Sequence, residues 1–121
     1  MLKKTLLILG VIILLSSCME NKKNIDLKSK VIDLAVKQIS NQTDLIEESG
    51  KFINPRTYKN NQIVYVDIED WTSGFFPGTI WYLYELTGDE KWKTLAAKYT
   101  ESLESAKNLK WHHDVGFMIN S

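Results

Sequence analysis

The chain has a single cysteine, and this scarcity excludes two kinds of site. With Cys18 alone among 121 residues, no intrachain disulfide can form and no set of thiolates can hold a metal ion. The string His112-His113-Asp114 is a poor metal site too, because adjacent loop residues seldom direct three ligands at one ion. No serine lies in a nucleophile-elbow setting. The sequence therefore predicts no metal site and no Ser-His-Asp triad.

The sequence also has no excess of positive or negative charge. Fifteen basic residues balance fifteen acidic ones, whereas a nucleic-acid-binding domain usually carries a basic face. We therefore expect no nucleic-acid partner. Arginine is nearly absent, and Arg56 is the only one. Its guanidinium could pair with a substrate carboxylate, but a structural role within its own loop is the stronger expectation.

No hydrophobic run is long enough to span a bilayer as a helix. The apolar stretch 6–15 is interrupted by Gly10 and follows two lysines, Lys3 and Lys4, which is the layout of a secretory signal peptide. It ends in Leu-Ser-Ser-Cys at 15–18, the arrangement of a bacterial lipobox. The alternatives to a lipoprotein signal peptide are a plain signal peptide with an incidental cysteine, or a short buried helix.

This N-terminal pattern predicts where the protein resides. We expect residues 1–17 to be a lipoprotein signal peptide, Cys18 to carry the lipid, and residues 18–26 to be a polar tether. Acyl chains contribute about 0.8 kcal/mol per buried methylene, so a multiply acylated cysteine holds firmly. The predicted location is the cell envelope, with the chain anchored to a membrane through Cys18 on the periplasmic side or at the outer surface.

The mature part is expected to be helical. Apolar residues recur every three or four positions over 27–48, which predicts an amphipathic helix that stops at Gly50. The segment 52–70 holds the turn signals Asn54-Pro55 and Asn60-Asn61 and is predicted to be a long loop with room for one short strand.

Two further helices should form an antiparallel hairpin. Pro77 is expected to open the first of them, which is apolar on nearly every side and should be buried. Gly88 is placed to cap its end and Asp89 to cap the start of the next helix. That helix carries its apolar residues on one stripe, namely Trp92, Leu95, Ala96, Tyr99, Leu103 and Ala106. A helix buried all round needs more neighbours than this chain offers, so we favour a piece of a larger helical domain over a small three-helix domain.

Two segments at loop-to-helix junctions are candidates for chemistry. The first is Asp-Trp-Thr-Ser-Gly-Phe-Phe-Pro-Gly at 70–78, and the second is Trp-His-His-Asp-Val-Gly-Phe at 111–117. Taken singly, each has a structural explanation. Asp114 could cap a helix that starts at Val115, and Trp71 could be a core residue.

Together these segments resemble the unsaturated glucuronyl hydrolases of glycoside hydrolase family 88. The resemblance is carried by the strings at 70–78, 83–89 (Leu-Tyr-Glu-Leu-Thr-Gly-Asp) and 112–117, and it runs from about Asn54 to the last residue. It implies an all-α fold, an (α/α)₆ helical toroid of which only the first few helices are present. Members of the family are several times longer, so residues 27–121 would be the truncated N-terminal part of that domain and inactive alone.

The resemblance also implies a reaction and a set of site residues. Such enzymes remove a 4,5-unsaturated uronic acid from oligosaccharides left by polysaccharide lyases, without metal or cofactor. Asp114 matches the family's first active-site aspartate, Trp71 matches a wall of the sugar pocket, and His113 would lie within hydrogen-bonding reach of substrate. The principal proton donor would be a second aspartate beyond Ser121, and Asp67, Asp70 and Asp89 are not expected to replace it.

Two other functions stay open from the sequence. One is a non-catalytic, glycan-binding helical lipoprotein that uses Trp71 and Trp111 as stacking platforms. The other is an unsaturated rhamnogalacturonyl hydrolase of the related family 105, which shares the barrel and the chemistry but whose signatures fit the string at 112–117 less well.

Overall fold

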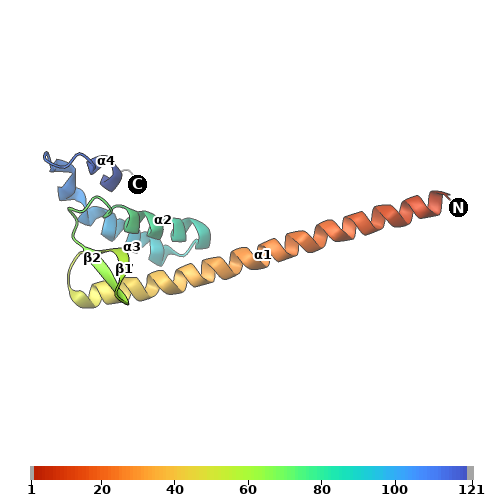
Figure 1. The fold of residues 1–121 in the computed structure, drawn as a ribbon, viewed down its shortest axis with the longest axis horizontal. Coiled ribbons are helices and arrows are strands. Elements are labelled where there is room, and N and C mark those ends of the chain that lie inside the picture. The colour runs from red at the N-terminus through yellow and green to blue at the C-terminus, as the bar shows by residue number, and fades with distance from the viewer. Residues whose placement is uncertain (1, 120–121) are drawn as a thin grey trace. The chain divides into compact units, whose positions relative to one another are not determined.

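The computed structural model describes residues 2–119, with side chains from residue 26 onward, and it is mostly helical (Figure 1). The elements in chain order are α1 (Leu2–Ser49), β1 (Asn54–Lys59), β2 (Gln62–Val66), α2 (Phe75–Thr87), α3 (Glu90–Ser102), the 3₁₀ helix η1 (Glu104–Asn108) and α4 (Val115–Ile119). The chain divides into two compact units, and the division falls within α1, between Leu34 and Ala35.

The first unit contains only the N-terminal part of α1. Within it, the Lys30 ammonium pairs with the Asp26 carboxylate one helical turn away, at 2.7 Å. The predicted signal peptide (1–17) and most of the tether (18–26) fall where, from Leu2 onward, only the helical main chain is described. The Cys18 side chain lies outside the described side chains, so lipid attachment stays a prediction. No helix in the described part of the chain is long and apolar enough to cross a membrane.

The core of the second unit forms where the end of α1 packs with α2 and α3. Ile46 of α1, Ile80 and Leu83 of α2, and Trp92 and Tyr99 of α3 are all buried in one cluster. The prediction that α1 ends next to Gly50 is confirmed. The stripe is confirmed in part: Trp92, Ala96 and Tyr99 face the core from α3, but the helix ends at Ser102, before Leu103 and Ala106. Burying such side chains contributes roughly 1.5–3 kcal/mol each, so this cluster is the main source of the unit's stability.

The connector between α2 and α3 has the predicted caps. Gly88 adopts a left-handed conformation (φ 69°), and its N–H donates to the Tyr84 carbonyl at 2.7 Å. The Asp89 carboxylate then accepts a hydrogen bond from the Lys91 N–H at 3.0 Å, which caps α3. Because both caps depend on neighbouring residues alone, this hairpin could be predicted from the sequence.

The prediction for α2 was wrong in two respects. The helix begins at Phe75, two residues before Pro77. Pro77 therefore lies in the first turn, where a main-chain N–H would have no partner within the helix in any case. The helix is also not buried all round. Phe76, Ile80 and Leu83 face the core, whereas Tyr82 and Leu86 are exposed together with Phe75.

The prediction of an all-α fold and of a long loop over 52–70 also needs correction. Strands β1 and β2 form an antiparallel hairpin through a two-residue turn, with Asn60 at φ 52° and Asn61 at φ 59°. Two positive φ values are what a type I′ turn requires, and asparagine tolerates them better than most residues. The Tyr65 hydroxyl donates to the Gln42 amide oxygen at 2.9 Å, which ties this hairpin to α1.

Candidate active site

The Asp70 carboxylate organises the first motif segment. It accepts hydrogen bonds from the main-chain N–H of Thr72 at 2.9 Å and from the Thr72 hydroxyl at 2.6 Å. Its other oxygen accepts a hydrogen bond from the Arg56 guanidinium at 3.0 Å. Both oxygens of the carboxylate therefore have partners within the chain, which joins Arg56 to the turn at 70–72.

The pKa of Asp70 is shifted by opposing effects. Burial alone would raise it, but the Thr72 hydroxyl and N–H, followed by the positive charge of Arg56 and a smaller electrostatic contribution from His112, lower the pKa below its ordinary value of 3.8. The carboxyl is therefore ionised at neutral pH. The contribution of His112 also means that the second motif segment lies close enough to act on the first.

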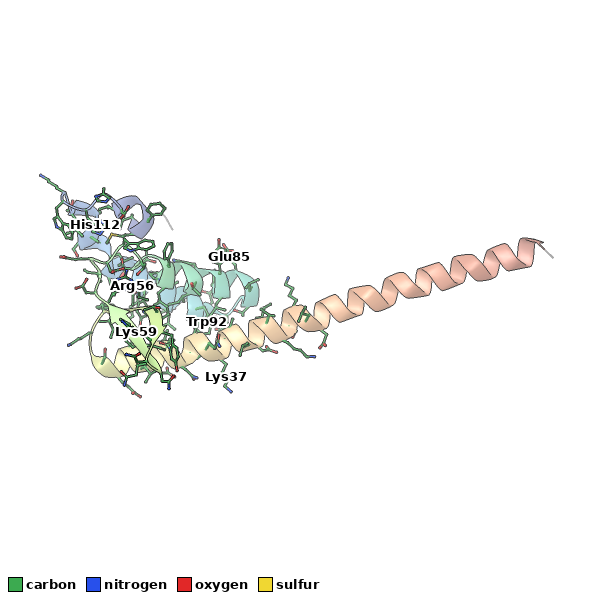
Figure 2. All side chains as sticks on the ribbon, viewed as in Figure 1. Lys37, Arg56, Lys59, Glu85, Trp92 and His112 are labelled. Atoms are coloured by element: carbon green, nitrogen blue, oxygen red, sulfur yellow. The ribbon has the colours of Figure 1, made fainter. Side chains whose placement is uncertain are left out.

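Arg56 reaches Asp70 because the hairpin is irregular at this position. Pro55 pairs with Tyr65 and Thr57 with Val64, so Arg56 is an extra residue in β1, as in a β-bulge. Bulges redirect a side chain and are frequent at strand ends near functional sites. The pairing with Asp70 supports the structural role expected for the only arginine, whose position is labelled in Figure 2.

The two motif segments meet at Gly74. A Cβ at Gly74 would lie 2.3 Å from the main-chain carbonyl oxygen of Met118 and 2.9 Å from that of Phe117. Only glycine allows the backbones to approach this closely. The Met118 side chain is buried, so the start of α2 and the main chain of α4 are packed together.

Asp114 stands directly before α4, as the sequence predicted. Its carbonyl accepts a hydrogen bond from the Phe117 N–H at 2.9 Å, and its own N–H donates to His112 Nδ1 at 3.2 Å. The Asp114 side chain is half-buried, and no described residue donates a hydrogen bond to its carboxylate. The carboxylate is thus held on a defined turn and left available to a ligand.

The other predicted site residues are at the surface. Trp71 is 41% exposed and makes an edge-to-face contact with Phe75, with ring centroids 5.8 Å apart, so the core role considered for it is not observed. His113 is exposed beside His112, with ring centroids 6.1 Å apart. Among the described side chains, no hydrogen bond, ion pair or ring contact joins Trp71 to Asp114 or His113.

A recess next to these segments was not predicted. Its volume is about 480 Å³, and it is lined by Tyr65, Val66, Asp67, Glu69, Asp70 and Trp111. It brings the end of β2 and the loop after it beside the start of the second motif segment. The signal that could have located the recess is the alternation of side chains over residues 63–68, before Asp70. This alternation predicts a strand, and β2 forms the edge of the recess. In the part of the chain described here, no group of three or more side chains is arranged to hold a metal ion.

Comparison with known proteins identifies relatives of one kind. The chain is 46% identical over 54 residues to an unsaturated glucuronyl hydrolase from Formosa agariphila, and 43% identical over 65 residues to one from a Bacillus species. It is 34% identical over 98 residues to an unsaturated chondroitin disaccharide hydrolase from Streptococcus pyogenes. These matches cover 45%, 50% and 74% of the chain but only 14%, 17% and 23% of the relatives.

The chain therefore spans less than a quarter of the length of the curated relatives it matches. No protein-family model matches it, and no solved structure matches it either. The matches nevertheless confirm the resemblance that the motifs indicated, because the relatives carry the names of the expected enzymes.

Proposed function

We propose that this chain, which is related in sequence to the unsaturated glucuronyl hydrolases, is the N-terminal part of a glycosidase that acts on unsaturated uronic-acid oligosaccharides. This chain would be inactive alone. The observation that carries the proposal is the contact of Gly74 with α4, which holds the two signature segments of the family against each other. The rest of an (α/α)₆ toroid would be formed by the length that the relatives have and this chain does not cover.

The proposed reaction is hydration of the 4,5 double bond of a terminal unsaturated uronic acid. A protonated carboxyl group adds a proton to C4, and positive charge develops on C5 and the ring oxygen. Water attacks C5 and gives up a proton to a basic group. C5 then carries a hydroxyl group beside the ring oxygen and is a hemiketal. The hemiketal opens to a C5 ketone, and the hemiacetal left at C1 then releases the alcohol. One water molecule is consumed for each bond cleaved.

The residues of this chain would have limited but defined parts in that reaction. Asp114, whose carboxylate has no donor among the described residues, would lie beside the proton donor and stabilise the developing positive charge. A second carboxylate nearby also raises the pKa of the donor, because two like charges do not ionise together easily. The donor itself would be a second aspartate, in the length that the relatives have and this chain does not cover.

Trp71 and His113 are proposed to bind the sugar. Both side chains are exposed, so each can reach a ligand without a change in the core. The indole of Trp71 offers an apolar face to the ring, and the imidazole of His113 offers a hydrogen bond. A lipid anchor at Cys18 would keep the enzyme in the envelope, where the products of lyases arrive.

A non-catalytic glycan-binding protein is the second candidate. It is favoured by one observation, the exposure of both Trp71 (41%) and Trp111 (68%), because exposed indoles are typical stacking surfaces. A binding protein would hold unsaturated disaccharides without consuming them.

Products formed in heavy water distinguish the candidates. A protein that contains this chain and the remaining length of its relatives should convert an unsaturated disaccharide, and deuterium should appear at C4 of the released uronic acid. Cleavage without deuterium at C4 would contradict the hydration mechanism. Binding without any cleavage would favour the second candidate.

A further inference from the structure

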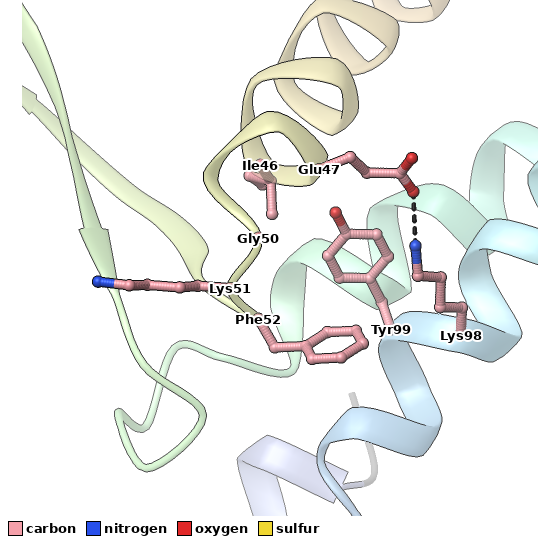
Figure 3. Close-up of a pocket in the computed structure, with 7 residues that line it drawn as sticks. All are labelled: Ile46, Glu47, Gly50, Lys51, Phe52, Lys98 and Tyr99. Atoms are coloured by element: carbon pink, nitrogen blue, oxygen red, sulfur yellow. Dashed lines mark hydrogen bonds and ion pairs between the residues drawn. The ribbon is translucent and has the colours of Figure 1, made fainter.

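A separate cavity lies between the end of α1, residues 50–52 and α3 (Figure 3). Its volume is about 280 Å³, close to the lower end of the roughly 300–1,000 Å³ typical of small-molecule sites. Seven residues line it: Ile46, Glu47, Gly50, Lys51, Phe52, Lys98 and Tyr99. None of them belongs to the two motif segments, so this cavity is distinct from the candidate active site.

The Tyr99 hydroxyl is an unused hydrogen-bond donor in this cavity. Although the Tyr99 side chain is almost fully buried (2% exposed), its hydroxyl is not a buried unsatisfied group: it opens to the cavity, and no described residue accepts a hydrogen bond from it. Burial, with a further contribution from the negative charge of Glu47, raises the pKa of Tyr99 to about 12. The phenol keeps its proton at neutral pH, and a ligand in the cavity that supplies an acceptor can take the place of the water that this hydroxyl would otherwise contact.

An aromatic ring forms another part of the cavity wall. Phe52 is 49% exposed, and it contacts Tyr99 edge to face with ring centroids 6.1 Å apart. A half-exposed ring held by a buried ring is fixed in position and still offers a surface to a ligand. Figure 3 shows the two rings next to each other, with the hydroxyl of Tyr99 on the side of Ile46 and Glu47.

The charged groups at the cavity are already balanced. The Lys98 ammonium pairs with the Glu47 carboxylate at 2.7 Å, and Lys51 points away from Tyr99 (Figure 3). An anionic ligand would meet the carboxylate of Glu47. A ligand with hydroxyl groups could instead donate to Glu47 and accept from Lys98 and Tyr99.

We propose that this cavity is a binding site for one neutral pyranose ring, held by stacking on Phe52 and by hydrogen bonds to Tyr99, Glu47 and Lys98. The size of the cavity, its aromatic wall and its mixed set of donors and acceptors all match that class of ligand. The site would hold a neutral sugar unit of a glycan at residues other than those of the two motif segments. It does not depend on the proposed function, because binding here needs no unsaturated sugar and no turnover.

The test is a titration with neutral sugars, followed by two-dimensional amide NMR, of a protein that contains this chain from residue 19 and the remaining length of its relatives. Methyl glucoside, methyl galactoside and N-acetylglucosamine are the probes, and glucuronate is the anionic comparison. At least one neutral sugar should give saturable shifts at residues 46–52 and 98–99, with a Kd in the millimolar range. Absence of saturable shifts at these residues with all three neutral sugars would overturn the proposal, as would glucuronate binding ten times more tightly than any of them.

Matched variants assign the binding to this cavity. Tyr99→Phe removes only the hydroxyl and should weaken binding about fivefold, the effect of one neutral hydrogen bond. Tyr82→Phe removes an exposed hydroxyl on α2 and should leave binding unchanged. Phe52→Ala alters a half-exposed ring and provides a second test if Tyr99→Phe disturbs the fold. Unchanged affinity in Tyr99→Phe and in Phe52→Ala would contradict the site.

Discussion

The α-carbon of Gly74 lies directly against the main-chain carbonyl of Met118, so that an added Cβ would stand 2.3 Å from that oxygen. This contact joins the start of α2 to α4, which are separated by α3 and η1 along the chain. It brings the segments at 70–78 and 112–117 into one place, and the proposed active site depends on it.

Gly74→Ala should therefore destabilise the protein and loosen α4. The backbone of Met118 cannot move away easily because its side chain is buried, so we expect a loss of about 1–3 kcal/mol in the free energy of unfolding. Gly116→Ala is the matched control, since a Cβ there has nothing within 4 Å and should be neutral or slightly stabilising. Urea unfolding and amide hydrogen exchange in α4 measure both variants. Equal stabilities would show that the close approach does not hold the segments together.

Asp70→Asn should weaken the same region in a pH-dependent way. The carboxylate accepts two hydrogen bonds from Thr72 and one from Arg56, so the variant should lose about 1–3 kcal/mol at pH 7. Because the folded pKa of Asp70 is lowered, its stabilisation is fully present above the unfolded value near 3.8 and is lost as the pH falls through the folded pKa. The difference between wild type and variant should thus shrink below about pH 4. A constant difference in urea unfolding between pH 7 and pH 2 would contradict this account.

Trp71→Ala should weaken substrate binding more than catalysis in the longer protein. The exposed indole is proposed to contact the unsaturated sugar, and removing one stacking surface should raise KM about tenfold while kcat falls less. Tyr82→Ala removes another exposed aromatic side chain, away from the motif segments, and serves as the control. Steady-state kinetics on an unsaturated disaccharide would separate the two constants. An unchanged KM in Trp71→Ala would remove Trp71 from the sugar site.

The parts of the fold that follow from neighbouring residues could be predicted from the sequence. Gly88 and Asp89 determine their caps through bonds to residues at most four positions away, and the stripe on α3 follows from helical periodicity. The β-hairpin was missed although Asn60-Asn61 was recognised as a turn, because the strands beside it alternate weakly and β1 is interrupted at Arg56.

The remaining features depend on contacts between distant segments. The exposed face of α2 could not be distinguished from a buried one, since Tyr82 and Leu86 are apolar enough for either environment. The closeness of Gly74 to Met118 and the pairing of Arg56 with Asp70 span 44 and 14 positions. No local pattern encodes such distances, and the motifs could be recognised only because they resemble a family.

The most direct test of the central claim uses a protein that contains this chain and the remaining length of its relatives. The measurement is the loss of ultraviolet absorbance as that protein consumes the double bond of an unsaturated disaccharide. Wild type and Asp44→Asn, an exposed carboxylate on α1, should consume the double bond at equal rates. Asp114→Asn should be slower by about 10²–10⁴-fold, the contribution typical of a positioned acid or base. Wild-type protein that leaves the absorbance of every lyase-derived disaccharide unchanged, or full activity in Asp114→Asn, would contradict the account.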